Sequence, residues 1–440
     1  MPSSSPPISY LSLYSVAALG IGSMVGAGIF ALMGQAVLAA GEGVYYSFLI
    51  GGAAALPSGY SYARLGSRFP GSGGIMDYFN RAFPSKLFSG TLCILYLITL
   101  AISCCLIAKS FGAYATKLFF PENAIPFWAV PIFSSSILIF LGAINMVGAG
   151  AVGKSEVVLV VFKLLILSVL IFAGLDHSFE SGQVPIPPAQ NDWMVIFGSV
   201  GLTFFAYAGF GMMANTAGNL RNPQKTLPRA IFTAIAIVTV LYVVLSFIVI
   251  RNVPTTALKS SMDTAIAETA APLMGRWGII AVSIAALIAS ASAINATLFS
   301  FIRISQEMAE RRQLDHAFRN TFLRHGSKGF LLTISGILIV TNLFNLTAIA
   351  NIASSTFLIC YLAVFAAHWR LRRETESHSL PILVGALLMA AILVAFLQHI
   401  YHTQPPALVA IVLFIIASFM IEFLIRKKQT SLIAPPRPPI

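Results

Sequence analysis

Long, unbroken hydrophobic runs dominate the chain, and polar residues gather in the short stretches between them. About twelve of these runs approach the twenty residues that an α-helix needs to cross a bilayer. None shows the ten-residue alternation of a transmembrane β-barrel, so we expect helical crossings. We place them near Leu11–Ala39, Val44–Gly66, Leu87–Phe119, Pro126–Val147, Val152–Gly174, Trp193–Asn215, Ala230–Ile250, Gly278–Ile302, Phe330–Leu346, Ala348–Trp369, Leu380–Phe396 and Leu408–Ile425.

Composition supports an all-α integral membrane protein. Of the 440 residues, 57% are hydrophobic and 10% are charged, whereas a soluble domain carries about a quarter charged residues. The loops are too short to hold a soluble domain. The four cysteines all lie in hydrophobic runs without metal-ligand spacing, so we expect small core side chains there, and no cofactor or metal.

The formal net charge of +12 raises the question of nucleic-acid binding. However, most Lys and Arg residues fall in alternate loops and in the C-terminal tail, while the opposite loops hold few basic residues and several acidic ones. This is the positive-inside pattern of a multi-pass protein of the inner or plasma membrane, with both termini cytoplasmic. We therefore expect the lipid bilayer, and no nucleic acid, as partner.

Glycines interrupt two of the predicted crossings. Gly20, Gly22, Gly26 and Gly28 cluster in the first run, and Gly209 and Gly211 lie in the sixth. One explanation of the first cluster is a tight helix-packing face. The two interrupted runs are the first and the sixth, so each begins a block of five crossings. This arrangement instead indicates an inverted repeat with a binding site at the membrane midplane.

Four segments carry a specific family resemblance, namely 22–30 (Gly-Ser-Met-Val-Gly-Ala-Gly-Ile-Phe), 205–231, 69–74 and 293–297. They resemble the amino acid–polyamine–organocation transporter superfamily, and are most similar to its proton-coupled prokaryotic amino acid transporters. The resemblance implies the fold of sodium-coupled neurotransmitter-type symporters (the LeuT fold). That fold has two inverted repeats, here about residues 11–175 and 192–373, with discontinuous helices 1 and 6, and two extra helices, here about 380–427. Many family members carry acidic residues where this chain has Gly211 and Gly218.

The resemblance also implies how an amino acid would bind. Backbone N–H groups of Gly26, Ala27 and Gly28 would face the carboxylate at a positive helix end. Carbonyls near the end of the inner half-helix and in the sixth crossing would face the ammonium group. The residues predicted for this site are Ile21, Ser23, Met24, Gly26, Ala27, Gly28, Phe205, Ala206, Ala208, Gly209 and Phe210. Phe205, Tyr207, Phe210 and Met212 either form the pocket wall or pack as ordinary helix residues.

Lys163 lies about eleven residues into the fifth crossing. An ammonium there costs at least about 2.5–3.5 kcal/mol, and intramembrane ionisable groups are usually functional. In the proton-coupled relatives that the chain resembles, a lysine at this place occupies the region where sodium-coupled relatives bind sodium. We predict that Lys163 couples protons to transport, with Gly22, Ser290 and Ser292 as neighbours. The alternative is a static lysine bonded to carbonyls. Lys109, in the third crossing, either reaches the outer interface or has a function.

No Asp or Glu falls in the middle of a crossing, which favours neutral over cationic substrates. The sequence therefore predicts proton-coupled, secondary active uptake of neutral amino acids by alternating access. An amino acid exchanger and a sodium-coupled symporter remain alternatives. A channel requires a continuous polar lining, and an enzyme requires a cluster of catalytic residues. The hydrophobic runs show neither pattern, so we expect no enzyme.

Overall fold

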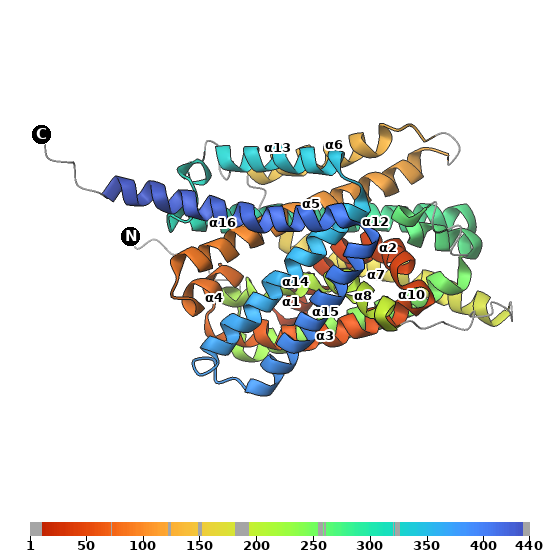
Figure 1. Ribbon diagram of the computed structural model, residues 1–440. Helices are drawn as coiled ribbons and strands as arrows, with labels where there is room; N and C mark the ends of the chain where they lie inside the picture. Colours follow the sequence, from red (N-terminus) through yellow and green to blue (C-terminus); the bar gives the residue numbers. More distant parts are fainter. Residues whose placement is uncertain are drawn as a thin grey trace, which may run out of the picture.

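The computed structural model describes residues 11–71, 73–121, 125–147, 152–180, 193–253, 258, 261–319, 321 and 326–433. Within these ranges the secondary structure is helical apart from one isolated bridge between Thr321 and Ser327. The long helices run side by side as one bundle (Figure 1).

The elements follow one another with short connections. The first half of the chain contains α1 (Leu13–Met24), η1 (Val25–Ile29), α2 (Phe30–Ala40), η2 (Gly41–Gly43), α3 (Val44–Arg68), α4 (Ile75–Ala82), α5 (Lys86–Phe119), α6 (Ala129–Val147) and α7 (Val152–Glu180). The second half contains α8 (Trp193–Phe205), η4 (Ala208–Phe210), α9 (Gly211–Ala214), η5 (Ala217–Asn219), α10 (Pro223–Asn252), η6 (Met262–Thr264), α12 (Ala265–Glu310), η7 (His316–Phe318), α13 (Lys328–Leu343), α14 (Leu346–Leu371), α15 (Ser379–Thr403) and α16 (Pro405–Ile433).

The prediction of an all-α membrane protein with about twelve crossings is confirmed. Ten stretches of the described residues are long and apolar enough to cross a membrane, and one of them, Phe30–Arg68, combines α2 with the whole of α3. Two shorter apolar helices, Leu13–Met24 and Lys328–Leu343, complete the set. Counting α1, η1 and α2 as one crossing and α8 to α9 as another gives twelve.

The sequence misplaced some helix ends. The eighth crossing was predicted near Gly278–Ile302, but α12 begins at Ala265 and bends at Gly275, which has a φ of 60°. Only glycine adopts that conformation easily, so the bend separates a short outer helix from the crossing. The ninth and tenth crossings part at Asn345, whose side chain accepts a hydrogen bond from the Ala348 N–H and starts α14 at Leu346.

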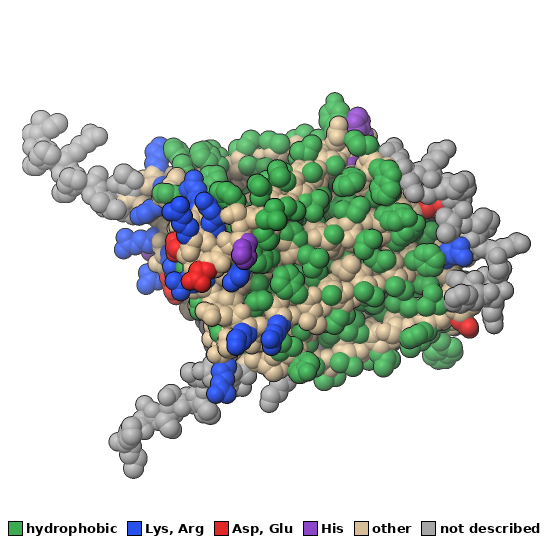
Figure 2. Space-filling model, turned by 90° about the horizontal axis from the view of Figure 1, so that it is seen from below, with side chains coloured by type: hydrophobic (Ala, Val, Ile, Leu, Met, Phe, Trp, Pro, Cys, Tyr) green, Lys and Arg blue, Asp and Glu red, His purple; other side chains and the backbone are tan. Residues whose placement is uncertain are grey.

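Charge is distributed unevenly over the surface. Figure 2 shows hydrophobic side chains along the flank of the bundle and Lys and Arg side chains gathered at one end. The described part of the chain also starts and ends toward that end (Figure 1). The apolar flank is therefore the surface that suits contact with lipid.

The first crossing lies inside the bundle. The helix α1 packs against α10 and α7, the η1 segment packs against α12, and α2 packs against α8. The helix α5 passes through the core, where it contacts α12, α14, α6 and α16. The two glycine-interrupted segments are thus enclosed by protein on several sides.

Close helix packing should depend on particular glycines. A Cβ added at Gly201 of α8 would lie 2.3 Å from the Phe396 ring of α15, whereas one added at Gly336 of α13 meets nothing within 4 Å. We predict that Gly201→Ala destabilises the protein by about 1–3 kcal/mol through overpacking. Gly336→Ala should be neutral or stabilising by up to about 1 kcal/mol, because alanine favours helix. Thermal unfolding in detergent would measure both, and equal midpoints for the two variants would contradict the packing described for α8 and α15.

Candidate functional site

The first crossing is interrupted by a π-helical turn at Val25–Ile29 rather than by a fully unwound stretch. The Val25 N–H at the junction reaches the carbonyls of both Gly22 and Ile21. Such π turns change the hydrogen-bond register and are frequent at functional sites. The interruption predicted for helix 1 is therefore present, but its backbone stays helical on both sides.

The sixth crossing is broken more strongly. The helix α8 ends at Phe205, a 3-10 turn covers Ala208–Phe210, and the short helix α9 follows. Tyrosine hydroxyls satisfy two of the carbonyls here: Tyr242 donates to the Ala206 oxygen at 3.2 Å, and Tyr361 donates to the Ala208 oxygen at 2.8 Å. Carbonyls released from the helix thus have partners in a region that water does not solvate.

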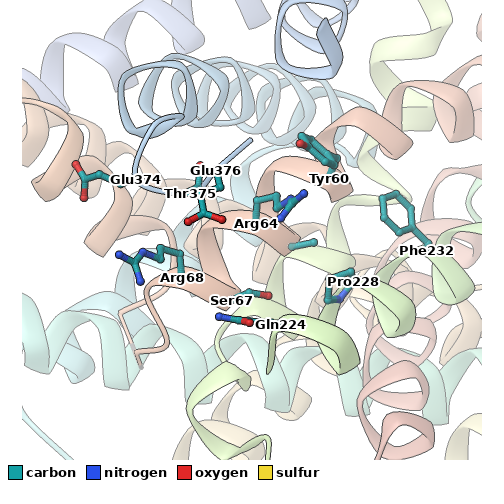
Figure 3. Close-up of a pocket in the computed structure, with 11 residues that line it drawn as sticks. Tyr60, Arg64, Ser67, Arg68, Gln224, Pro228, Phe232, Glu374, Thr375 and Glu376 are labelled. Atoms are coloured by element: carbon teal, nitrogen blue, oxygen red, sulfur yellow. The ribbon is translucent and has the colours of Figure 1, made fainter. Parts of the chain in front are cut away.

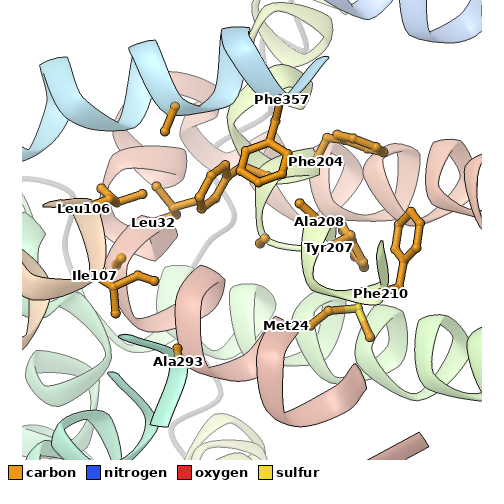
Figure 4. Close-up of a cluster of buried hydrophobic side chains, with 14 of the residues drawn as sticks. Met24, Leu32, Leu106, Ile107, Phe204, Tyr207, Ala208, Phe210, Ala293 and Phe357 are labelled. Carbon is orange, nitrogen blue, oxygen red and sulfur yellow. The ribbon is translucent and has the colours of Figure 1, made fainter. Parts of the chain in front are cut away.

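Glycines allow the two interrupted segments to touch. A Cβ on Gly28 would lie 2.4 Å from the Ala206 Cα, and one on Gly209 would lie 2.6 Å from the Met24 nitrogen. Gly26 faces α12 instead, where a Cβ would lie 2.7 Å from the Ala289 oxygen. In Figure 4, Met24 lies opposite Ala208 and Phe210. The alternative explanation of the glycines, a tight packing face, therefore also applies, because they let the two broken segments pack against each other.

A small cavity of about 30 Å³ lies at this contact. That volume has room for about two water molecules by this measure, less than an amino acid needs. Its walls come from six crossings and contain no charged side chain. The lining residues are Ser23, Tyr62, Tyr96, Leu100, Ser103, Ile107, Phe205, Ala206, Ala208, Gly209, Gly211, Met212, Thr297, Phe357 and Tyr361.

Five of the predicted site residues line this cavity, namely Ser23, Phe205, Ala206, Ala208 and Gly209. The others do not line it: Ile21, Gly22, Met24, Gly26, Gly28 and Phe210 are buried close by, and the Ala27 side chain lies outside the described residues. Among the suggested wall residues, Met212 lines the cavity and its sulfur accepts a hydrogen bond from Ser23 at 3.3 Å. Tyr207 instead donates to the Phe48 carbonyl at 2.8 Å and belongs to the packing.

Sequence reasoning missed the contribution of the other helices. Tyr62 of α3, Tyr361 of α14 and Phe210 form a ring cluster, with centroids 5.3 Å apart for Tyr62 and Tyr361 and 5.5 Å apart for Phe210 and Tyr361. Phe205 meets the Phe357 ring at 5.2 Å. Hydroxyl and phenol groups inside hydrophobic runs could have indicated these residues. A hydrophobic run alone, however, does not show which faces of different helices meet at one cavity.

Lys163 lies where the sequence predicts it, inside the bundle. Its side chain is fully buried, and its Nζ donates a hydrogen bond to the Gly22 carbonyl at 2.9 Å. This hydrogen bond joins α7 to the end of α1, just before the π turn. Ser290, also fully buried, and the half-buried Ser292 belong to α12, which packs against both α7 and η1.

Lys109 has a different environment. Its Nζ donates to the carbonyls of Thr341, at 3.0 Å, and Phe344, both at the C-terminal end of α13. Cations are favourable at that end of a helix. Lys109 therefore links α5 to α13 in this structure. This link is a third interpretation of Lys109, beside a reach to the membrane interface and a functional role.

Polar contacts close both ends of the bundle. At the end opposite the termini, Gln35 of α2 donates to Asp263 at 3.3 Å and accepts from Thr347 at 2.8 Å. At the basic end, Arg311 pairs with Asp77 of α4 at 2.7 Å.

Comparison with known proteins defines the class. The family described as "Amino acid permease" matches residues 11–431. The chain therefore belongs to the amino acid permease family, and it is a multi-pass membrane transporter. It is 40% identical to the inner membrane transport protein YbaT of Escherichia coli (strain K12), over 96% of this chain and 97% of the relative. It is also 25% identical to two Bacillus subtilis proteins: the serine/threonine exchanger SteT, over 83% of this chain and 84% of the relative, and the methylthioribose transporter, over 96% and 94%.

The contact between the two broken segments should be essential for transport. We predict that Gly28→Ala lowers the initial uptake rate at least about tenfold, because the added methyl group collides with the Ala206 backbone and overpacking costs about 1–3 kcal/mol. Gly218→Ala is the matched control, since a Cβ there meets nothing within 4 Å. Uptake of labelled amino acids into proteoliposomes, normalised to folded protein, would measure both. Equal rates would show that the close approach of these segments is dispensable.

Proposed function

We propose that this chain takes up neutral amino acids by alternating access, driven by protons. The observation that carries the proposal is the meeting of two interrupted crossings at a cavity inside the bundle. Backbone groups at such breaks recognise the common part of an α-amino acid, since N–H groups suit a carboxylate and carbonyls suit an ammonium group. Gly26, Ala27 and Gly28 would supply the former, and Ile21 to Met24 with Phe205, Ala206 and Ala208 the latter.

The cavity walls support a neutral substrate. A buried cationic side chain would need a carboxylate partner, and the residues that line the cavity include none. The Ser103 and Thr297 hydroxyls and the aromatic rings suit small or moderately apolar side chains. Because the cavity is smaller than an amino acid, substrate entry requires the segments to move apart, as alternating access demands.

The repeat organisation and orientation are part of this proposal. Residues 11–175 and 192–373 would form two inverted five-helix repeats, each headed by an interrupted crossing, with residues 380–427 as additional helices. The basic end of the bundle, with both termini, would face the cytoplasm.

Lys163 is the proposed coupling group, because it bonds to the Gly22 carbonyl beside the π turn. In this proposal the Lys163 ammonium group releases its proton during the transport cycle. Loss of the proton would weaken the link between α7 and α1 and permit α1 to move. Ser290 and Ser292 would line the same region.

Amino acid exchange is the second candidate, because a relative matched over most of its length bears the name serine/threonine exchanger. Uptake into proteoliposomes across an imposed pH gradient separates the candidates. We expect accumulation of neutral amino acids with the gradient, and no requirement for sodium. Uptake only into vesicles preloaded with amino acid would establish exchange, and a sodium requirement would establish sodium coupling.

Two substitutions test Lys163. We predict that Lys163→Ala folds but loses proton-driven accumulation, while it still equilibrates substrate down its gradient. Lys163→Arg keeps a cation and hydrogen-bond donors but cannot deprotonate, so it should fail to accumulate as well. Accumulation comparable to the unsubstituted protein in Lys163→Arg would assign the lysine a static, structural role. Unchanged accumulation in Lys163→Ala would remove it from the mechanism.

A further inference from the structure

A second cavity, larger than the central one and lined by different residues, lies at the basic end of the bundle. Its volume is about 430 Å³, within the range of small-molecule sites. The walls are the last turns of α3, the first turns of α10 and the turn that joins α14 to α15 (Figure 3). No residue lines both cavities. This one is lined by Tyr60, Ala63, Arg64, Ser67, Arg68, Gln224, Pro228, Phe232, Glu374, Thr375 and Glu376.

Hydrogen bonds hold the three walls in place. The Ser67 hydroxyl donates to the Pro223 carbonyl at 3.0 Å, which fixes α3 to the start of α10. The His378 N–H donates to the Tyr60 hydroxyl at 3.0 Å, which fixes the α14–α15 turn to α3. The buried His368 ring lies 2.9 Å from the hydroxyls of both Ser61 and Ser377. The cavity is thus a preformed feature and not a gap between independent loops.

The cavity carries opposite charges on opposite walls. Arg64 and Arg68 belong to α3, whereas Glu374 and Glu376 belong to the α14–α15 turn. Among the described residues, no ion pair within 4 Å joins these two arginines to these two glutamates. In Figure 3, Arg64 extends into the space between the turn and α10, near Glu376. Its guanidinium carbon lies 5.6 Å from the centroid of the Tyr60 ring, which restricts its position.

The rest of the lining is apolar or neutral. Ala63, Pro228 and Phe232 provide carbon surface beside the charged groups, and Gln224 and Thr375 provide neutral polar atoms. A phosphate or another simple anion would meet two carboxylates here, and a simple cation would meet two guanidinium groups. A small zwitterion with an apolar side chain complements all of these surfaces, because guanidinium groups bind carboxylates in bidentate fashion and carboxylates accept from ammonium.

We propose that this cavity is a second amino-acid site, separate from the transport site, at the end of the bundle that we assign to the cytoplasm. The choice of ligand rests on the proposed function, since transported neutral amino acids collect on that side. Arg64 and Arg68 hold the carboxylate, Glu374 and Glu376 hold the ammonium group, and the side chain lies against Pro228 and Phe232.

Equilibrium binding of labelled L-leucine to the full chain in nanodiscs tests the site. Binding is measured in the Gly28→Ala background, in which we expect the central site to bind leucine weakly because the added methyl group collides with the Ala206 backbone. We expect one leucine per chain, with binding weakened about tenfold or more by Arg64→Gln and by Glu376→Gln, each of which removes a charge-assisted hydrogen bond. Arg372→Gln is the matched control, because Arg372 stacks on Trp369 outside the cavity. It should bind leucine like its parent.

Competitors establish the ligand class. 4-Methylpentanoate is leucine without the ammonium group and isoamylamine is leucine without the carboxylate, so neither should displace leucine at concentrations at which unlabelled leucine does. Displacement by inorganic phosphate or by phosphatidylglycerol in the disc would mark an anion or lipid site and overturn the proposal. Absence of leucine binding, or binding that ignores both charge substitutions, would overturn it too. Uptake in the otherwise unsubstituted protein is scored separately, so failure of transport and failure of this cavity are distinguishable.

Discussion

Satisfaction of backbone polar groups inside the membrane is the constraint on which this structure depends. A crossing that departs from the α-helix releases carbonyls and N–H groups that lipid cannot solvate. Here the departures are enclosed by neighbouring helices, and side chains supply the missing partners. Tyr242 and Tyr361 donate to carbonyls of the sixth crossing, and Lys163 donates to the carbonyl of Gly22 in the first. The breaks are therefore stable only as parts of one connected interior.

Hydrogen bonds from side chains to the two broken segments also allow these segments to change partners inside an otherwise rigid bundle. Hydrogen bonds from side chains are exchanged more readily than those of a continuous helix, because the donor can rotate away without unwinding a turn. In the proposed binding mode, the substrate ammonium group would replace such a donor at a released carbonyl, and the carboxylate would accept from backbone N–H groups. The contact of Gln35 with Asp263 and the pair of Asp77 with Arg311 lie on either side of this centre.

Much of the fold was readable from the sequence because lipid imposes a simple pattern. Long hydrophobic runs predict the crossings, and the glycines of the first and sixth runs predict where they are interrupted. The exact form of the interruption was not predictable: a π turn at Val25–Ile29 and a 3-10 turn at Ala208–Phe210 depend on contacts made by other helices. For the same reason Tyr62, Tyr96 and Phe357 escaped notice, since one hydrophobic face of a helix resembles another until its neighbours are known. The burial of Lys163 was predictable because the residue lies about eleven residues into a hydrophobic run, whereas its role in coupling stays a prediction.

The most direct test of the central claim is an experimental structure of the full chain in nanodiscs at saturating concentration of an amino acid that it accumulates. We expect ligand density between the π turn of the first crossing and residues 206–211, with its carboxylate toward the backbone of residues 26–28. Density confined to another part of the bundle, with these two segments still in direct contact, would contradict it.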